Sequence, residues 1–165
     1  TVALIKTGVM ECYEDVRELL LNFRERLHKE SFAEGIATVI ERFEMQTKLK
    51  VRLVTRGDGQ ELTDKQKLQV IFIMQEALAN VRKHSKATQV QVDVRNEEDF
   101  ELAVSDNGIG IDEGILKARS KRHVGLSIMR ERASRIGAVV SVEPVAAELY
   151  RNGTTVRLVI PQVAR

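Results

Sequence analysis

The spacing of apolar residues predicts helices in the first part of the chain. Residues 9 to 27 place apolar side chains at alternating steps of four and three, which is the pattern of a coiled-coil seam. This segment is either a helix docked on its own domain or half of a helical dimerisation hairpin. A second helix is expected from Ser31 to about Thr47, because Ser31 and Glu34 match a capping box. The seam is Val9, Tyr13, Val16, Leu20, Phe23 and Leu27, and the apolar stripe of the second helix is Phe32, Ile36, Val39, Ile40 and Phe43.

Period-two alternation predicts strands in the second part of the chain. Residues 90 to 94 and 100 to 104 alternate apolar and polar positions around the tetrapeptide NEED, which predicts an antiparallel hairpin. Further strands are expected over KVRLVTRG, AVVSVEP and TTVRLVIP, and a helix over GLSIMRERASRIG that ends at Gly137. This order predicts an α+β, two-layer α/β sandwich, with a mixed, mainly antiparallel sheet covered by helices on one face. We expect residues 1–28 to be the tail of a dimerisation helix and residues 29–165 to be one domain.

Composition narrows the range of functions. A length of 165 residues with 43% apolar residues suits one core. The net charge of +2 and an aromatic content of 4% offer little to nucleic acid, so no such partner is expected. Cys12 is the only cysteine, which excludes an internal disulfide and favours a reducing, cytoplasmic setting. Because the chain enters a helical pattern directly at Thr1, we expect a fragment whose only link to a membrane would be upstream segments.

The third predicted helix, from near Thr63 to about His84, has three chemically different polar side chains on one face. Glu76, Asn80 and Lys83 lie roughly opposite its apolar stripe. A solvated surface is the ordinary explanation for such a face. However, an amide oxygen can ligate Mg²⁺, an ammonium can meet phosphate and a carboxylate can orient a reactant. The three side chains together therefore suit a metal-nucleotide site.

Two glycine-containing stretches follow that helix in a fixed order. The first, SDNGIGID, places Asp106 at a strand end, where a carboxylate can accept a hydrogen bond from the exocyclic amine of adenine. Gly108 and Gly110 would let the backbone come close to a ligand. In the second, HVGLSIMRERA, we expect Gly125 and Leu126 to stand where a helix begins and offers free N–H groups to phosphate.

The order of these motifs resembles a known family. QEALANVRKHSKAT resembles the N-box, DNGIG the first glycine box and HVGLSIMRERA the second glycine box of the ATP-binding domain of sensor histidine kinases. DNA gyrase B, Hsp90 and MutL share that fold. The match covers roughly residues 31 to 161, and its wording is most similar to the nitrate/nitrite sensor branch.

The resemblance implies a site for ATP and Mg²⁺. Asn80 would coordinate Mg²⁺, Lys83 and His84 would lie near the phosphates, and Glu76 would prepare the transfer. Asp106 would read adenine. The remaining expected contacts are Gly108, Gly110, Gly125, Leu126 and Thr154, with residues 111 to 124 as a lid over the nucleotide.

The reaction that the resemblance implies is transfer of the γ-phosphoryl group of ATP to a histidine. The chain offers no evident acceptor, since His28 is expected to be a surface residue and His123 a structural or phosphate-proximal one. The implied partners are a response-regulator receiver domain and a second copy in a full-length homodimer anchored in the inner membrane. Two alternatives stay open: a nucleotide-gated interaction module without phosphotransfer, and a conformational ATPase.

Overall fold

The computed structural model describes residues 32–59, 61–110 and 121–162, with side chains from residue 124 in the last range. Several predicted features lie outside these ranges. They are the seam at residues 9–27, His28, the capping residue Ser31, lid residues 111–120 and the side chain of His123.

Five strands form one mixed sheet in the order β1-β2-β3-β5-β4. The first two strands pair in parallel, and the other neighbours pair antiparallel. The predicted hairpin around NEED is therefore confirmed as β2 and β3, and the fold class is confirmed with it. The strands are β1 (Val51–Arg56), β2 (Val90–Asn96), β3 (Phe100–Asp106), β4 (Val139–Pro144) and β5 (Thr154–Ile160).

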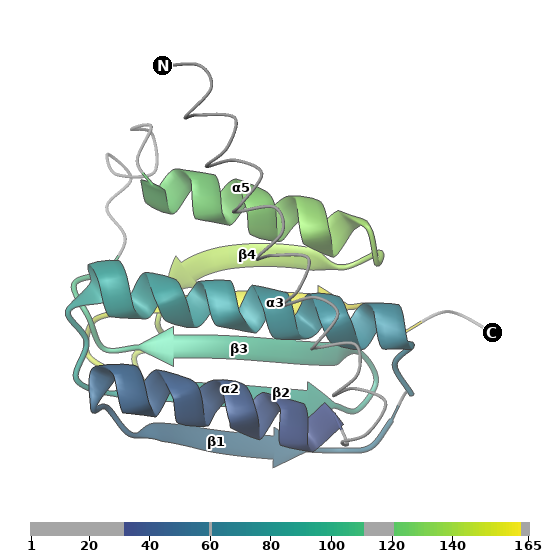
Figure 1. Cartoon of the computed structure of the whole chain (residues 1–165), viewed down its shortest axis with the longest axis horizontal. Coiled ribbons are helices and arrows are strands. Elements are labelled where there is room, and N and C mark those ends of the chain that lie inside the picture. The colour runs from purple at the N-terminus through teal and green to yellow at the C-terminus, as the bar shows by residue number, and fades with distance from the viewer. Residues whose placement is uncertain (1–31, 60, 111–120, 163–165) are drawn as a thin grey trace, which may run out of the picture.

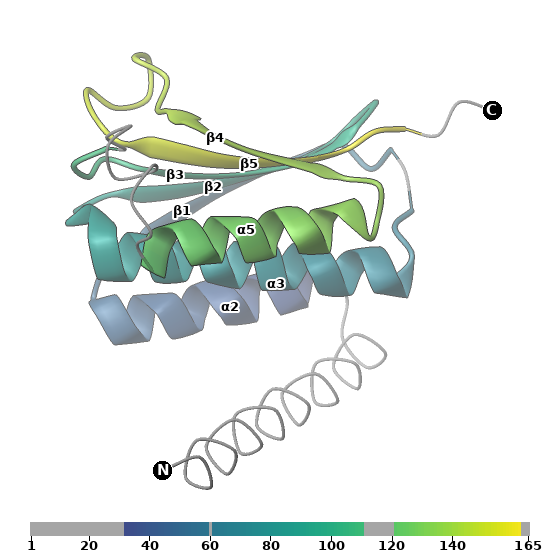
Figure 2. The same cartoon turned by 90° about the horizontal axis from the view of Figure 1, so that it is seen from above.

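The helices cover one face of this sheet, which gives the molecule two layers (Figure 2). Figure 1 shows α2 over the β1 side of the sheet, α3 over its middle and α5 over β4. The helices are α2 (Phe32–Thr47), α3 (Asp64–Asn80) and α5 (Lys121–Ser134), and a π-turn labelled η1 (Val81–Ser85) extends α3.

The core lies between the two layers because the inward positions of the strands meet the apolar stripes of the helices. Met74 of α3, Val92 of β2, Met129 of α5 and Leu158 of β5 are all fully buried. Burial of side chains of this size contributes about 1.5 to 3 kcal/mol each. The core therefore fixes α3 and α5 against the strands from which the nucleotide motifs emerge.

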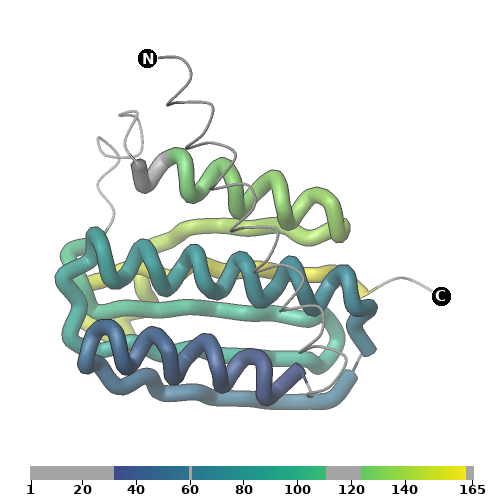
Figure 3. Tube along the Cα trace, viewed as in Figure 1, coloured from purple at the N-terminus to yellow at the C-terminus, as the bar shows by residue number. Residues whose placement is uncertain are grey.

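Both ends of α5 differ from the sequence prediction. The predicted start at Gly125 is wrong, because the helix begins at Lys121 and Gly125 lies in its second turn, and the helix ends at Ser134 rather than at Gly137. Figure 3 shows the path of the chain from this helix into β4.

Helix α3 begins next to Thr63, as predicted, and Thr63 is its N-cap, forming with Gln66 a capping box that the apolar pattern did not indicate. At its other end α3 widens into η1, and the left-handed backbone of Lys86 (φ 55°) ends the helical path.

Candidate functional site

One of the three polar residues predicted on the third helix is buried in the structure. Asn80 is only 8% exposed, whereas Glu76 is half-buried and Lys83 is exposed. The solvated-surface explanation therefore fails for Asn80. No described residue forms a hydrogen bond or an ion pair with these three side chains. An amide without such a partner is available to a ligand.

The π-turn η1 carries the next two predicted residues, Lys83 and His84. Its last residue, Ser85, is buried and donates its hydroxyl to the carbonyl of Val81 at 2.8 Å. The same hydroxyl accepts from the backbone N–H of Ala87 at 3.1 Å. Single π-turns within helices occur frequently at functional sites. Here the turn holds three basic residues, Arg82, Lys83 and His84, at the end of α3.

Asp106 ends β3, and its side chain is 3% exposed. Its Oδ1 accepts a hydrogen bond from the backbone N–H of Gly108 at 2.8 Å, which closes the turn that follows. A Cβ at position 108 would meet the carbonyl oxygen of Ser85 at 2.1 Å, so this position requires glycine. Gly110 adopts a positive φ of 79°, which glycine tolerates best.

Thr154 lies opposite Asp106 on the neighbouring strand β5. It is 2% exposed, and its Oγ1 has no hydrogen-bond partner among the described residues. Burial of an unsatisfied hydroxyl costs about 1 to 3 kcal/mol. A ligand or a bound water that paired with this hydroxyl would recover that cost.

Helix α5 approaches α3 closely at Gly125. A Cβ added there would lie 2.6 Å from Oε1 of Glu76 and 3.6 Å from both terminal atoms of Asn80. Gly125 itself is buried, and the next residue, Leu126, is 3% exposed. The second glycine motif therefore brings α5 against the Glu76 and Asn80 side chains.

A small, partly open cavity lies where these elements meet. Four of the predicted residues line it, namely Asn80, Asp106, Leu126 and Thr154. Glu76 lies beside the cavity, because its side chain and that of Asn80 both approach Gly125. The cavity walls do not include Lys83, His84, Gly108 or Gly110. The other walls are formed by Ala77, Val81, Val104, Val142 and Val156. Apolar walls with a few convergent polar groups are the usual form of a small-molecule site.

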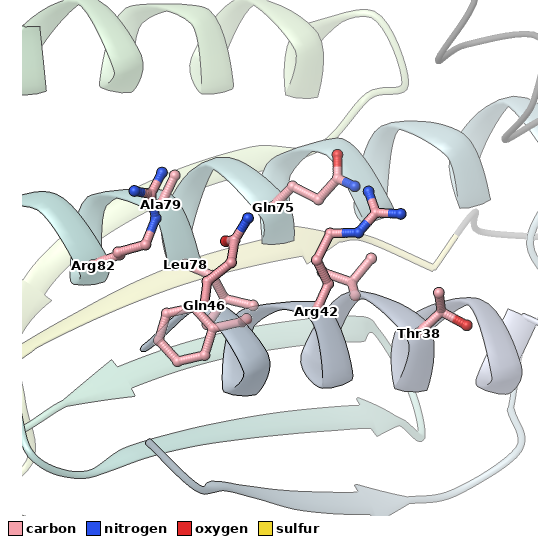
Figure 4. Close-up of a pocket in the computed structure, with 9 residues that line it drawn as sticks. Thr38, Arg42, Gln46, Gln75, Leu78, Ala79 and Arg82 are labelled. Carbon is pink, nitrogen blue, oxygen red and sulfur yellow. The ribbon is translucent and has the colours of Figure 1, made fainter. Parts of the chain in front are cut away.

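A larger groove lies between α2 and α3. Figure 4 shows Arg42 and Gln46 from α2 and Gln75 from α3 around it, with Arg82 at one end. Its walls include none of the predicted nucleotide residues. We therefore assign the functional site to the smaller cavity, whose polar groups are buried and converge.

The residues around the smaller cavity fit a nucleotide with a divalent cation. The buried Asp106 carboxylate and the unsatisfied Thr154 hydroxyl suit the polar edge of a base, and the apolar walls suit its faces. The Asn80 amide oxygen is a hard donor of the kind that Mg²⁺ accepts. The described residues contain no cluster of three or more His, Cys, Asp or Glu side chains that could hold a metal. A Mg²⁺ ion at Asn80 would therefore depend on phosphate oxygens and water molecules for its other ligands.

Two contributors to the site were not predicted. Gly153 packs so closely that a Cβ would lie 1.7 Å from the carbonyl oxygen of Asp106, and its φ is +142°. Asn107 accepts hydrogen bonds from the backbone N–H groups of Thr88 and Gln89, each at 2.8 Å. An Asn-Gly pair in a turn signals only the turn, so the sequence carried no sign of this longer contact.

Sequence comparison relates the chain to bacterial sensor proteins. It is 31% identical over 133 residues to the nitrate/nitrite sensor protein NarQ of Escherichia coli K12, covering 79% of this chain and 23% of that protein. It is 29% identical over 162 residues to the sensor protein VraS of Staphylococcus epidermidis, covering 97% of this chain and 44% of VraS. The chain thus spans less than half the length of these relatives. Among the described residues, no helix is both long and apolar enough to cross a membrane.

Solved structures with the same fold are histidine kinase domains. The ATP-binding domain of PrrB from Mycobacterium tuberculosis superimposes with a TM-score of 0.58 at 23% identity, covering 78% of this chain and 95% of that one. Histidine kinase AdeS of Acinetobacter baumannii gives a TM-score of 0.65 at 14% identity, covering 92% of this chain and 77% of that one. At such identities the likeness establishes the fold alone.

A family model matches residues 63–164, which include α3, the Asp106 turn, α5 and β5. The model describes ATPases similar to histidine kinases, DNA gyrase B and HSP90. Its match spans all of the motifs that carried the resemblance in the sequence. The chain therefore belongs to the histidine kinase-, DNA gyrase B- and HSP90-like ATPase family.

Proposed function

We propose that this chain is the ATP-binding catalytic domain of a sensor histidine kinase, and that the cavity between α3, β3, β5 and α5 is its ATP site. One observation carries the proposal. The buried carboxylate of Asp106 and the unsatisfied hydroxyl of Thr154 are paired in register and line the same cavity as Asn80. The sensor proteins among its relatives support the kinase class.

Asp106 would select adenine over guanine. An ionised carboxylate only accepts hydrogen bonds, and adenine offers its N6 amine as a donor where guanine presents the O6 acceptor. The Oδ1 atom already accepts from Gly108, which orients the carboxylate. Thr154 would supply its hydroxyl to the same edge of the base.

The residues of α3 and η1 would bind the phosphates of ATP and the Mg²⁺ ion. Asn80 would hold Mg²⁺, which when bound neutralises phosphate charge and orients the transferred group. Lys83 would add a positive charge, and His84 would lie beside it on η1. Glu76 would orient the attacking group, since its carboxylate lies next to Asn80 across Gly125.

The reaction would transfer the γ-phosphoryl group to a histidine nitrogen. A bond forms between that nitrogen and the γ-phosphorus while the bond from phosphorus to the β,γ-bridging oxygen breaks, and ADP leaves. The acceptor histidine would belong to a dimerisation domain whose last helix ends in residues 1–28, and the phosphoryl group would pass to a response-regulator receiver domain. Nitrate or nitrite is the stimulus suggested by the NarQ relative.

The test is phosphorylation of the full-length protein by ATP labelled in the γ-phosphate. We expect acid-labile, base-stable label on histidine, and its loss in Asn80→Ala. Gln46→Ala is the matched control, because Gln46 is exposed on α2 and lines only the larger groove. Nucleotide binding without any label would favour the interaction-module alternative. Steady phosphate release without protein label would favour the conformational ATPase.

A further inference from the structure

We infer that Asn107 is a positioning residue that holds the adenine side and the phosphate side of the proposed ATP site at a fixed separation. It does so through a clasp, which we define as the contacts of Asn107 and Ile109 with residues 85–89. The inference rests on the proposed nucleotide site and adds to it a residue that would touch neither base nor phosphate.

The clasp is made by the whole Asn107 side chain. Oδ1 accepts from the backbone N–H groups of Thr88 and Gln89 at 2.8 Å each, and Nδ2 donates to Oγ1 of Thr88 at 2.9 Å. Nδ2 also lies 3.5 Å from Oε1 of Gln89. These contacts reach a segment 18 to 19 residues away in the sequence. The Asn107 amide therefore links the turn after β3 to the segment before β2.

The backbone reinforces the same contact. The N–H of Asn107 donates to the carbonyl of Gln89 at 3.2 Å, and the N–H of Ile109 donates to the carbonyl of Ser85 at 2.8 Å. Ser85 is in turn fixed by its hydroxyl to Val81 and Ala87. The absence of a Cβ at Gly108 permits the approach, because a side chain there would collide with Ser85.

The two segments carry different halves of the proposed site. Residues 85–89 begin with the last residue of η1, which holds Lys83 and His84 one turn after Asn80. Asn107 follows directly on Asp106, which lines the cavity with Asn80. A displacement of the turn relative to η1 would therefore change the separation of adenine and phosphate contacts. A ligand that uses both halves needs them at the correct distance, so a small displacement lowers its affinity more than that of a ligand that uses only one half.

The test separates positioning from stability by comparing two ligands. We define the phosphate gain as Kd for AMP divided by Kd for ADP with Mg²⁺, both measured by calorimetry on this chain. A variant that merely unfolds a fraction of the molecules raises both Kd values by the same factor and leaves the gain unchanged. A variant that disturbs the separation of the two halves lowers the gain.

We expect Asn107→Ala to lower the phosphate gain by about fivefold or more, since it removes the acceptor of two backbone N–H groups. Thr88→Val removes only the Oγ1 partner of Nδ2 and is expected to lower the gain by about twofold. Thr88 is exposed, so this variant decides the matter if Asn107→Ala does not fold. Gln46→Ala on α2 is the control for an unchanged gain.

The outcomes distinguish this inference from the function on which it rests. If the unaltered chain binds both ligands and the variants keep its phosphate gain, the clasp does not position the site and the inference is overturned. If the unaltered chain binds neither AMP nor ADP, the proposed ATP site is wrong and the inference falls with it. A reduced gain with both ligands still bound supports the clasp.

Discussion

Asp106 and Thr154 are partners in register across β3 and β5, and both side chains are buried at the wall of the same cavity. The carboxylate of Asp106 is held by the N–H of Gly108, whereas the hydroxyl of Thr154 has no partner among the described residues. A protein keeps such an unsatisfied group at a cost in stability. The pair therefore offers a buried acceptor and an unpaired hydroxyl at one point of the cavity wall.

Thr154→Val should separate stability from binding. The substitution keeps the shape of the side chain and removes an unsatisfied buried hydroxyl, so the free energy of unfolding should stay equal or rise by about 1 kcal/mol. The affinity for ADP should fall, because the proposed contact with the base is lost. Urea unfolding and calorimetric titration of the same variant measure both quantities.

Thr155→Val is the matched control for that variant. The hydroxyl of Thr155 pairs with the hydroxyl of Ser105 at 2.8 Å on the other face of the sheet. Its removal should lower the free energy of unfolding by about 1 kcal/mol and leave ADP affinity unchanged. If Thr155→Val weakened ADP binding as much as Thr154→Val, the assignment of Thr154 to the site would be wrong.

Gly153→Ala should be severely destabilising. The new Cβ would lie 1.7 Å from the carbonyl oxygen of Asp106, which is backbone and cannot move aside, and the φ of +142° adds strain. We expect a loss of about 3 kcal/mol or more in the free energy of unfolding, or failure to fold. Gly137→Ala is the comparison, since Gly137 has a φ of +68° but no atom within 4 Å of the added Cβ. It should cost about 1 kcal/mol, and equal losses in thermal melts would contradict this account.

Gly125→Ala should affect catalysis more than folding. The added Cβ would meet the end of the Glu76 side chain at 2.6 Å, and that flexible side chain can move away. Alanine also favours the helix by about 0.5 to 1 kcal/mol, so the melting temperature should not fall. Histidine phosphorylation in the full-length protein should fall about tenfold, because Glu76 is displaced. Ser127→Ala, at an exposed position of the same helix, is the control, and an unchanged rate in Gly125→Ala would remove Glu76 from the proposed mechanism.

Tyr150 should limit stability at alkaline pH. Its pKa is raised above the ordinary value of 10.0, chiefly because burial disfavours the phenolate. Arg52 opposes the shift, while Asp106 and Asp93 reinforce it. A raised pKa in the folded state means that the contribution to stability is present below pH 10.0 and is lost as the pH rises through the folded-state pKa.

The comparison that checks this is urea unfolding of the unaltered chain and of Tyr150→Phe between about pH 9 and about pH 11. The unaltered chain should lose stability more steeply than Tyr150→Phe, which has no group to ionise at this position. Parallel pH profiles for the two proteins would show that Tyr150 is not responsible.

The local part of the fold could be predicted from the sequence. Strands β2 and β3 follow from period-two alternation on both sides of a short polar turn, and α3 follows from its apolar stripe. The order β3-β5-β4 and the parallel pairing of β1 with β2 depend on contacts between distant segments. Apolar alternation fixes which side of a strand is buried, but not which strand lies beside it.

In the candidate site, too, the local features could be predicted, whereas the contacts between distant segments could not. Asp106 and its glycines were recognisable because turn chemistry is local. The position of Thr154 opposite Asp106 depends on the register of β3 and β5, and the burial of Asn80 depends on the approach of α5 at Gly125. The early start of α5 was missed because the charged residues 121 to 123 show none of the apolar spacing of a helix, although Ser120 before them is of a type common at helix starts.

The central claim is that Asp106 reads adenine in an ATP site, and the most direct test is calorimetric titration of this chain with ADP and with GDP, in the presence of Mg²⁺. Asp106→Asn is the informative variant, because its amide oxygen can still accept from Gly108 while the negative acceptor is lost. We predict that ADP binds at least about tenfold more tightly than GDP, and that Asp106→Asn abolishes most of this difference. Equal affinity for the two nucleotides, or ADP binding that is indifferent to Asp106→Asn, would contradict the account.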